Sequence, residues 1–177
     1  MPLPPTYDQP WETIVKTMKK AIFGAALLAV AGGAHAAEIV RHTGPQPAMI
    51  LQGVTIPPGA EVAMMSGALA SPIDPAKTPD SIESFGDTKT QTISTLNNIK
   101  ARLAAIGFKM SDIVKLTVFV NGDPKLGGKM DFAGMNDGFK QFFGTPENPS
   151  TVTRSTVQVA ALAGPAYLVE IEATAAK

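Results

Sequence analysis

Cysteine is absent from this chain of 177 residues, and histidine and arginine are scarce. Without cysteine the protein has no disulfide, no thiolate nucleophile and no cysteine-ligated metal site. The two histidines, His35 and His42, lie far from any pair of acidic residues, so neither a zinc site nor a histidine-based catalytic site is expected. The sequence therefore predicts no bound metal.

An excess of positive charge is also missing. The chain has 15 basic and 15 acidic residues, and its arginines are Arg41, Arg102 and Arg154. Proteins that bind nucleic acid normally carry a clustered basic surface, and no such cluster is visible in the sequence. The composition, with 45% hydrophobic residues, instead suits one globular domain with a sizeable core.

The N-terminal segment has the layout of a secretory signal peptide. Lys19 and Lys20 precede a short apolar run over residues 21–31, and Ala34-His35-Ala36 forms a cleavage site of the small-x-small type. We predict cleavage after Ala36, which leaves residues 37–177 as a single periplasmic or secreted domain. Its net charge would be −1, because three lysines and two acidic residues are removed.

Two alternatives concern this segment. An uncleaved membrane anchor is one, although the apolar run is shorter than the ~20 residues that a membrane span needs. No cysteine follows the run, so a lipoprotein anchor is excluded. Residues 1–17 do not resemble the start of a signal peptide, so Met18 is the expected initiator, with a longer basic region as the other possibility.

Hydrophobic periodicity predicts five strands and two helices. The first helix, over 87–106, is indicated by apolar residues at spacings of three and four, with Gly107 as its C-terminal cap. The second helix is predicted over 131–143, and residues 37–49 are predicted to be irregular. Strands are expected at 50–56, 62–67, 113–120, 151–162 and 167–173, and the last two are expected to form a hairpin turned at Ala163-Gly164-Pro165. The apolar positions of the first helix are Ile93, Leu96, Ile99, Leu103 and Ile106.

This order of elements predicts an α+β fold in which both helices pack on one face of a sheet, since each helix has one apolar stripe. The other face of the sheet still needs to be covered. Residues 114–120 and 156–161 are apolar on both faces. A partner subunit is therefore expected to supply the missing cover.

Two charged residues stand out in the last two strands, which are otherwise apolar. Arg154 offers a planar fork of donors suited to a carboxylate, and Glu170 offers a base or an acceptor for a water molecule. Taken alone, Arg154 fits better with a surface arginine that pairs with water or with Glu172 than with a carboxylate-binding residue. Glu170 and Glu172 share one face of their strand, which usually means a solvated face and only weakly suggests a paired-carboxylate hydrolase. Whether Arg154 and Glu170 face one pocket depends on strand register.

Asn136 and the pair Ser66-Gly67 are further candidates. Asn136 falls on the apolar face of the second helix, between Phe132 and Phe139, so its amide needs a structural or a ligand partner. Ser66 has no neighbouring histidine and no nucleophile elbow, so it is a candidate for binding and not for nucleophilic attack.

Three segments together resemble the RidA family (YjgF/YER057c/UK114), whose members hydrolyse reactive imines and enamines. They are Arg154-Ser155 with the apolar run to Leu162, the stretch Val169–Ala173, and the second helix with Phe132, Asn136 and Phe142-Phe143. The resemblance extends from about Gln52 to Lys177. It implies a chorismate-mutase-like α+β fold, assembled as a homotrimer around a barrel core, with one site at each subunit interface.

The resemblance also implies roles for the candidate residues. Arg154 would bind the substrate carboxylate, Glu170 would position the attacking water, and Ser66, Gly67 and Asn136 would line the pocket. The implied reaction converts a 2-imino acid or its enamine to a 2-oxo acid and ammonia. It requires no cofactor, because an imine is already electrophilic.

The chain departs from the family pattern at several positions. Ile50 stands where an aromatic residue is common, Thr156 where cysteine is frequent, and Val152-Thr153 where a Pro/Ala pair usually precedes the arginine. Loops 70–86 and 121–130 are also longer, and a signal peptide is unusual for the family. The alternative is therefore a trimer that binds a small carboxylate, or acts as a chaperone-like scaffold, without turnover. RNA cleavage is a further alternative, and the near-neutral charge argues against it.

Overall fold

The computed structural model describes residues 38–76 and 78–177, so the signal peptide predicted for residues 1–36 lies outside the described part. Three short 3-10 turns accompany six strands and two longer helices in those ranges. None of the helices described is long and apolar enough to cross a membrane. The bounds in chain order are β1 (Val40–His42), β2 (Gly53–Thr55), β3 (Val62–Leu69), α2 (Thr88–Ala105), β4 (Ile113–Asn121), α3 (Phe132–Phe139), β5 (Thr153–Val159) and β6 (Val169–Ala176).

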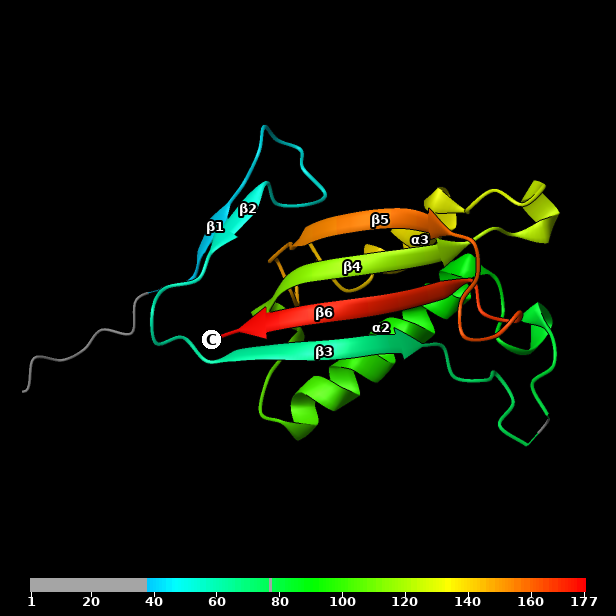
Figure 1. The fold of residues 1–177 in the computed structure, drawn as a ribbon. Coiled ribbons are helices and arrows are strands. Elements are labelled where there is room, and N and C mark those ends of the chain that lie inside the picture. The colour runs from blue at the N-terminus through cyan, green and yellow to red at the C-terminus, as the bar shows by residue number, and fades with distance from the viewer. Residues whose placement is uncertain (1–37, 77) are drawn as a thin grey trace, which may run out of the picture. The chain divides into compact units, whose positions relative to one another are not determined.

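The main sheet has four strands in the order β3-β6-β4-β5 (Figure 1). Strands β4 and β5 are parallel, while β6 is antiparallel to both β3 and β4. The hairpin predicted for the last two strands is therefore wrong, because β4 lies between β5 and β6. The turn residues near Gly164 are a local signal, and they do not determine beside which strand the chain returns.

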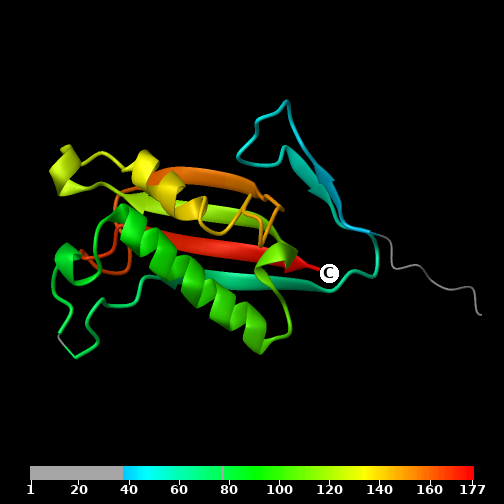
Figure 2. The same cartoon turned by 180° about the vertical axis from the view of Figure 1, so that it is seen from behind.

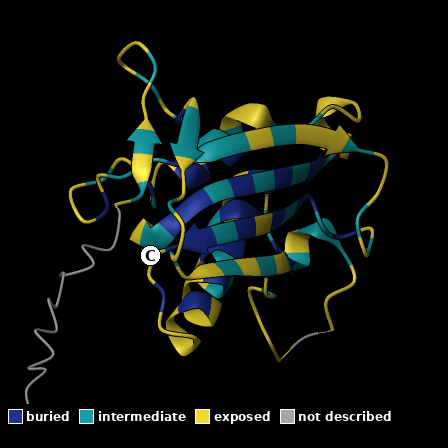
Figure 3. Ribbon diagram, turned by 60° about the vertical axis from the view of Figure 1, so that its left-hand side comes forward, coloured by how far each residue is buried: buried dark blue, intermediate teal, exposed yellow. Residues whose placement is uncertain are grey.

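Both helices cover the same face of this sheet, which confirms the predicted arrangement (Figure 2). Side chains along β4 alternate between buried and half-buried, as expected for a strand with one face on the core (Figure 3). Among the described residues, no helix lies on the opposite face of the sheet. The core between sheet and helices is formed by Leu116, Val118 and Val120 of β4, Leu96, Ile99 and Leu103 of α2, and Met135 and Phe139 of α3.

The first predicted helix agrees with α2 to within one residue at each end. Asp87 caps its start by accepting a hydrogen bond from the Thr90 backbone N–H at 2.8 Å. Gly107 follows its end with a φ of 80°, a conformation that favours glycine. Ile106 was expected on the core face but is 51% exposed, because the helix already ends at Ala105. The second predicted helix is shorter than expected, since α3 ends at Phe139.

Strands β1 and β2 form a separate two-stranded sheet, so the segment 37–49, predicted to be irregular, contains a strand. Arg41 ties this sheet to the rest of the domain. Its guanidinium donates to the carbonyl oxygens of Ser111 at 2.7 Å, Ile113 at 3.0 Å and Thr151 at 3.2 Å, and burial lowers its pKa. Leu51 adds a backbone hydrogen bond of 2.9 Å to Val152. Residues 48–51 are thereby held beside the start of β5.

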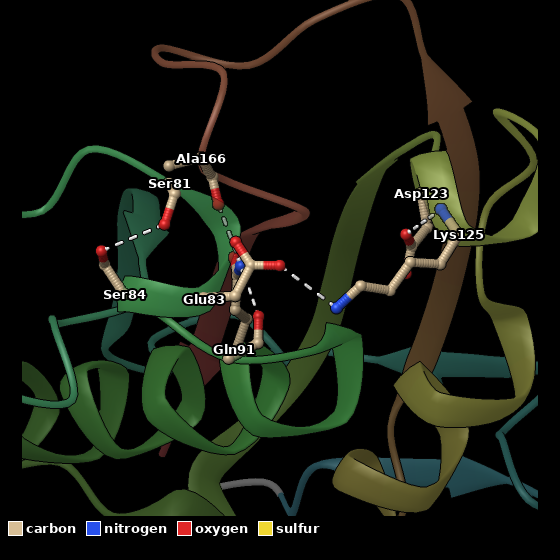
Figure 4. Close-up of polar contacts among 8 residues, drawn as sticks. Ser81, Glu83, Ser84, Gln91, Asp123, Lys125 and Ala166 are labelled. Carbon is tan, nitrogen blue, oxygen red and sulfur yellow. Dashed lines mark hydrogen bonds and ion pairs between the residues drawn. The ribbon is translucent and has the colours of Figure 1, made fainter.

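The connection from β5 to β6 is fixed to α2 by the buried side chain of Gln91. Its amide donates to the carbonyl oxygen of Ala166 at 3.0 Å and accepts the backbone N–H of Leu168 at 2.8 Å. Figure 4 shows Gln91 and Ala166 together with a nearby surface ion pair between Lys125 and Glu83, 3.3 Å apart. Both the nitrogen and the oxygen of the Gln91 side-chain amide have hydrogen-bond partners, so the burial of Gln91 does not indicate a ligand site.

Candidate functional site

Arg154 lies on the helix-covered face at the start of β5. It is aligned with Leu116 of β4, and residues aligned across neighbouring strands share a face. This orientation points the guanidinium at α3. It donates a hydrogen bond of 2.7 Å to the side-chain oxygen of Asn136 and sits 4.4 Å from the ring centre of Phe139. The predicted pair Arg154 and Asn136 is thus in direct contact.

The guanidinium of Arg154 is half-buried, and no described carboxylate forms an ion pair with it. Burial lowers the pKa of Arg154, but arginine remains charged at any physiological pH. Its remaining contacts are weak acceptors, the sulfur atoms of Met135 at 3.7 Å and Met49 at 4.0 Å. A desolvated cation with several unused donors is an anion receptor, best suited to a planar carboxylate.

A second cluster forms on the helix-free face from β3 and β6. Glu170 and Glu172 both lie on this face, as their spacing predicted, while Ile171 between them is buried in the core. A β-bulge between Met65 and Ala68 inserts one extra residue at Ser66-Gly67. A side chain at Gly67 would collide with the carboxylate of Glu170, so glycine is what makes room for that carboxylate.

Ser66 lies in a shallow hollow of about 250 Å³ on the same face. The hollow is also lined by Lys115, Thr117 and Glu172, and it lies beside the Gly67–Glu170 contact along β3 and β6. The side-chain carboxylate of Glu170 makes no hydrogen bond or ion pair with any described residue. A carboxylate in this state has its acceptor positions available for water.

Within one chain, the two clusters lie on opposite faces of the sheet. Strand β4 separates them laterally, with Leu116 aligned to Arg154 and Phe119 aligned to Glu170. The three-residue offset corresponds to about 10 Å along the strands. Arg154 and Glu170 therefore do not share a pocket within one chain, and Arg154 does not pair with Glu172 of its own chain. Any site that uses both clusters must combine residues of two chains.

Sequence reasoning missed three neighbours of Arg154, and it singled out Thr156 only as a departure from the family pattern. Met49 and Met135 contact its guanidinium, and Phe139 supplies a ring face as well as core packing. Thr156 shares the face of Arg154 because it lies two residues further along β5, and its buried hydroxyl has no partner among the described residues. The alternation of side chains along a strand could have placed Thr156 on the same face as Arg154. The contact between Met49 and Arg154 could not be predicted in this way, because it depends on where residues 48–51 lie in the folded chain.

Two further observations concern other types of site. The described ranges contain no group of three or more His, Asp or Glu side chains arranged to hold a metal ion. A larger cavity, of about 490 Å³, lies between α2 and the loop after α3, where Phe108, Met110 and Phe142 line it. It includes none of the predicted site residues, so volume alone does not identify the site.

Comparison with known proteins identifies relatives over most of the domain. The family model described as Endoribonuclease L-PSP matches residues 52–177. A RutC family protein from Pyrococcus horikoshii is 41% identical over 106 residues, which is 60% of this chain and 73% of that protein. The 2-iminobutanoate/2-iminopropanoate deaminase of Salmonella typhimurium is 37% identical over 127 residues, 72% of this chain and 86% of that enzyme.

Solved structures agree with the fold. A Rid-family protein, YyfB from Yersinia pestis, has a TM-score of 0.58 at 24% identity, covering 77% of this chain and 98% of that one. Escherichia coli TdcF, solved with bound serine, has a TM-score of 0.50 at 34% identity, covering 77% of this chain and 91% of that one. The mixed sheet with two helices on one face is therefore the arrangement of these proteins.

Proposed function

Because the chain belongs to the Endoribonuclease L-PSP family, which includes the RidA proteins, we propose that it hydrolyses reactive 2-imino acids or their enamine tautomers to 2-oxo acids and ammonia. One observation carries this proposal. Arg154 is a half-buried cation without a carboxylate partner among the described residues. Its contacts with the Asn136 amide and the Phe139 ring hold the guanidinium in place. A 2-imino acid supplies the missing carboxylate.

The proposed reaction needs only the chain's own residues and water. Arg154 holds the carboxylate through charge-assisted hydrogen bonds, and Asn136 orients the guanidinium. Glu170 takes a proton from a water molecule, whose oxygen attacks the imine carbon and forms a tetrahedral carbinolamine. Proton transfer to nitrogen allows the carbon–nitrogen bond to break, so that ammonia leaves and a 2-oxo acid remains. Most of the rate gain would come from positioning, since the imine is already electrophilic.

We further propose that the active form is a homotrimer in which Arg154 of one chain meets Ser66, Gly67 and Glu170 of a neighbour. Two features support this assembly. The two clusters lie on opposite faces of one chain's sheet, and the helix-free face exposes apolar side chains such as Met64, which is 83% exposed, and Val157. Covering this face with a second copy would remove apolar area from water and complete the site in one step.

The decisive experiment compares wild type with Arg154→Ala, both purified from Ala37 onward. An amino-acid oxidase generates 2-imino acids in the assay, and release of ammonia is followed with time. We expect the wild type to accelerate release and Arg154→Ala to lose that acceleration while remaining folded. Arg102→Ala is the matched control, because Arg102 is an exposed arginine on α2 outside the site, and it should behave as wild type. Full activity in Arg154→Ala would refute the mechanism.

The second candidate function is binding of a small carboxylate without turnover. Thr156 favours this second function for two reasons. Its buried hydroxyl has no partner among the described residues and could hold a ligand beside Arg154. Threonine also replaces the cysteine that is frequent in the family at this position. The relative TdcF has been solved with serine, a small carboxylate. This candidate predicts thermal stabilisation by 2-oxobutanoate or serine together with no acceleration of ammonia release.

We also propose that the mature protein acts in the periplasm or outside the cell, on the strength of the signal-peptide pattern over residues 18–36. Expression of the full chain in a Gram-negative host, followed by fractionation and N-terminal sequencing, tests this. A mature N-terminus at Ala37 in the periplasmic fraction is expected, and an intact N-terminus in the cytoplasm would refute it.

A further inference from the structure

Two methionine sulfur atoms contact the guanidinium of Arg154, and only one of them is open to solvent. Met135 lies 3.7 Å from Nη1 and is wholly buried in the core. Met49 lies 4.0 Å from Nη2, on the other arm of the fork, and is 38% exposed. In the single chain, Met49 is therefore the more accessible of the two methionines whose sulfur atoms face Arg154.

The segment that carries Met49 is fixed on both sides. The backbone N–H of Ala48 donates to the side chain of Gln46 at 3.1 Å, and the N–H of Leu51 donates to Val152, next to β5, at 2.9 Å. The bond from Leu51 ties the backbone next to Met49 to the start of the strand that carries Arg154, so the Met49 side chain is held beside the guanidinium.

We propose that Met49 is an oxidation site through which a peroxide weakens carboxylate binding at Arg154; this rests on the carboxylate-binding role proposed above for that arginine. The O–O bond of the peroxide breaks, one oxygen is transferred to the sulfur of Met49, and the other leaves as water or an alcohol. The sulfur is oxidised by two electrons and the peroxide is reduced by two. Methionine sulfoxide can be reduced back by sulfoxide reductases, so the change is reversible.

The consequence follows from the acceptor strength of the two forms. Nη2 donates one hydrogen to Asn136 at 2.7 Å, and its second hydrogen faces the Met49 sulfur. A thioether sulfur is a weak acceptor and leaves that second hydrogen available to a ligand. The sulfoxide oxygen is a strong, neutral acceptor that extends from the sulfur toward the same nitrogen. It would occupy a donor that the carboxylate needs. Oxidation should therefore weaken ligand binding without unfolding the domain, because Met49 is outside the core.

The test treats wild type, Met49→Leu and Met110→Leu with hydrogen peroxide and measures binding of 2-oxobutanoate by calorimetry, alongside ammonia release. Met110→Leu is the matched control, since Met110 is partly buried in the wall of a cavity that includes none of the site residues. Peptide mass spectrometry reports the oxidation of each methionine. We expect roughly a tenfold rise in Kd for oxidised wild type and oxidised Met110→Leu, reversed by methionine sulfoxide reductase, and no rise for Met49→Leu.

Three results would overturn the proposal. The first is a loss of 2-oxobutanoate affinity in peroxide-treated Met49→Leu equal to that in wild type. The second is an unchanged affinity in wild type whose Met49 is fully converted to sulfoxide. The third is a Met49 that peroxide does not oxidise while Met110 is oxidised. Binding and turnover separate this inference from the proposed function. Reduced wild type that binds 2-oxobutanoate without turnover leaves the oxidation test intact, whereas reduced wild type that binds no carboxylate overturns both.

Discussion

At the scale of single residues, Arg154 illustrates how an unusual electrostatic environment indicates function. A charge taken out of water is normally paired, because desolvation is costly. Arg154 instead contacts an amide, an aromatic ring and two thioethers. Burial lowers the pKa of Arg154, but arginine titrates so far above neutrality that its charge is constant there. Any pH dependence of activity near neutrality therefore has to come from another group.

Gly67 allows a sharp test at the same scale. In Gly67→Ala the new methyl group would meet the carboxylate of Glu170, a flexible group that can move aside. We expect the free energy of unfolding to change by less than about 1 kcal/mol, as for most substitutions outside the core. The displaced base should lower kcat by roughly 100-fold, in the range found for loss of general base catalysis. Initial rates of ammonia release and urea denaturation measure the two effects.

Gly53→Ala is the control for that variant. It makes the same change in β2, where the new methyl group would come no closer than 3.8 Å to the His42 ring, an ordinary contact. Its activity and stability should match those of wild type. A Gly67→Ala protein that is folded and fully active would show that the position of Glu170 against Gly67 is irrelevant to turnover.

At the scale of elements, the start of α2 makes stability depend on pH. The pKa of Asp87 is lowered, first by the hydrogen bond from the Thr90 backbone and then by one from the Thr90 hydroxyl. A carboxylate whose pKa is lower in the folded state stabilises the fold above its unfolded pKa, and this contribution is lost as the pH falls through the folded pKa. Asp87→Ala should cost about 1 kcal/mol at neutral pH, typical of a lost cap.

The measurement is urea denaturation of wild type and Asp87→Ala at neutral and at strongly acidic pH, at one protein concentration. The difference in unfolding free energy should shrink in acid, where the wild-type carboxyl is protonated. Asp80→Ala removes an exposed aspartate from the loop before α2 and should show neither effect. A difference that persists undiminished in acid would mean that the cap does not act through its charge.

The elements also show what the sequence can and cannot predict. Helix α2 was predicted to within one residue because its apolar spacing and the cap at Gly107 are local signals. The alternation of Glu170 and Glu172 was local as well. The position of β6 between β3 and β4 was not predicted, because strand pairing depends on contacts between distant residues such as Phe119 and Glu170. For the same reason, the sequence left open whether Arg154 and Glu170 face one pocket.

At the scale of the whole molecule, that strand order decides how a site can be assembled. A cyclic trimer joins different surfaces of neighbouring copies, so the helix-covered edge of one chain can meet the helix-free face of the next. Each interface would then take Arg154 and Asn136 from one chain, and Ser66, Gly67 and Glu170 from its neighbour. An arrangement of this kind predicts that two variants, each inactive alone, regain activity when they assemble into one trimer.

Co-expression of Arg154→Ala and Glu170→Gln with different affinity tags, followed by purification through both tags, isolates mixed trimers. In a cyclic trimer of either composition, one interface combines an intact Arg154 from one chain with an intact Glu170 from the next. The mixed trimers should therefore recover about one third of wild-type activity, although each variant alone is inactive. Mixing Arg154→Ala with the double variant is the control, since no chain then supplies the arginine. Mixed trimers without activity would overturn the shared site, because they would show that Arg154 of one chain does not work together with Glu170 of its neighbour.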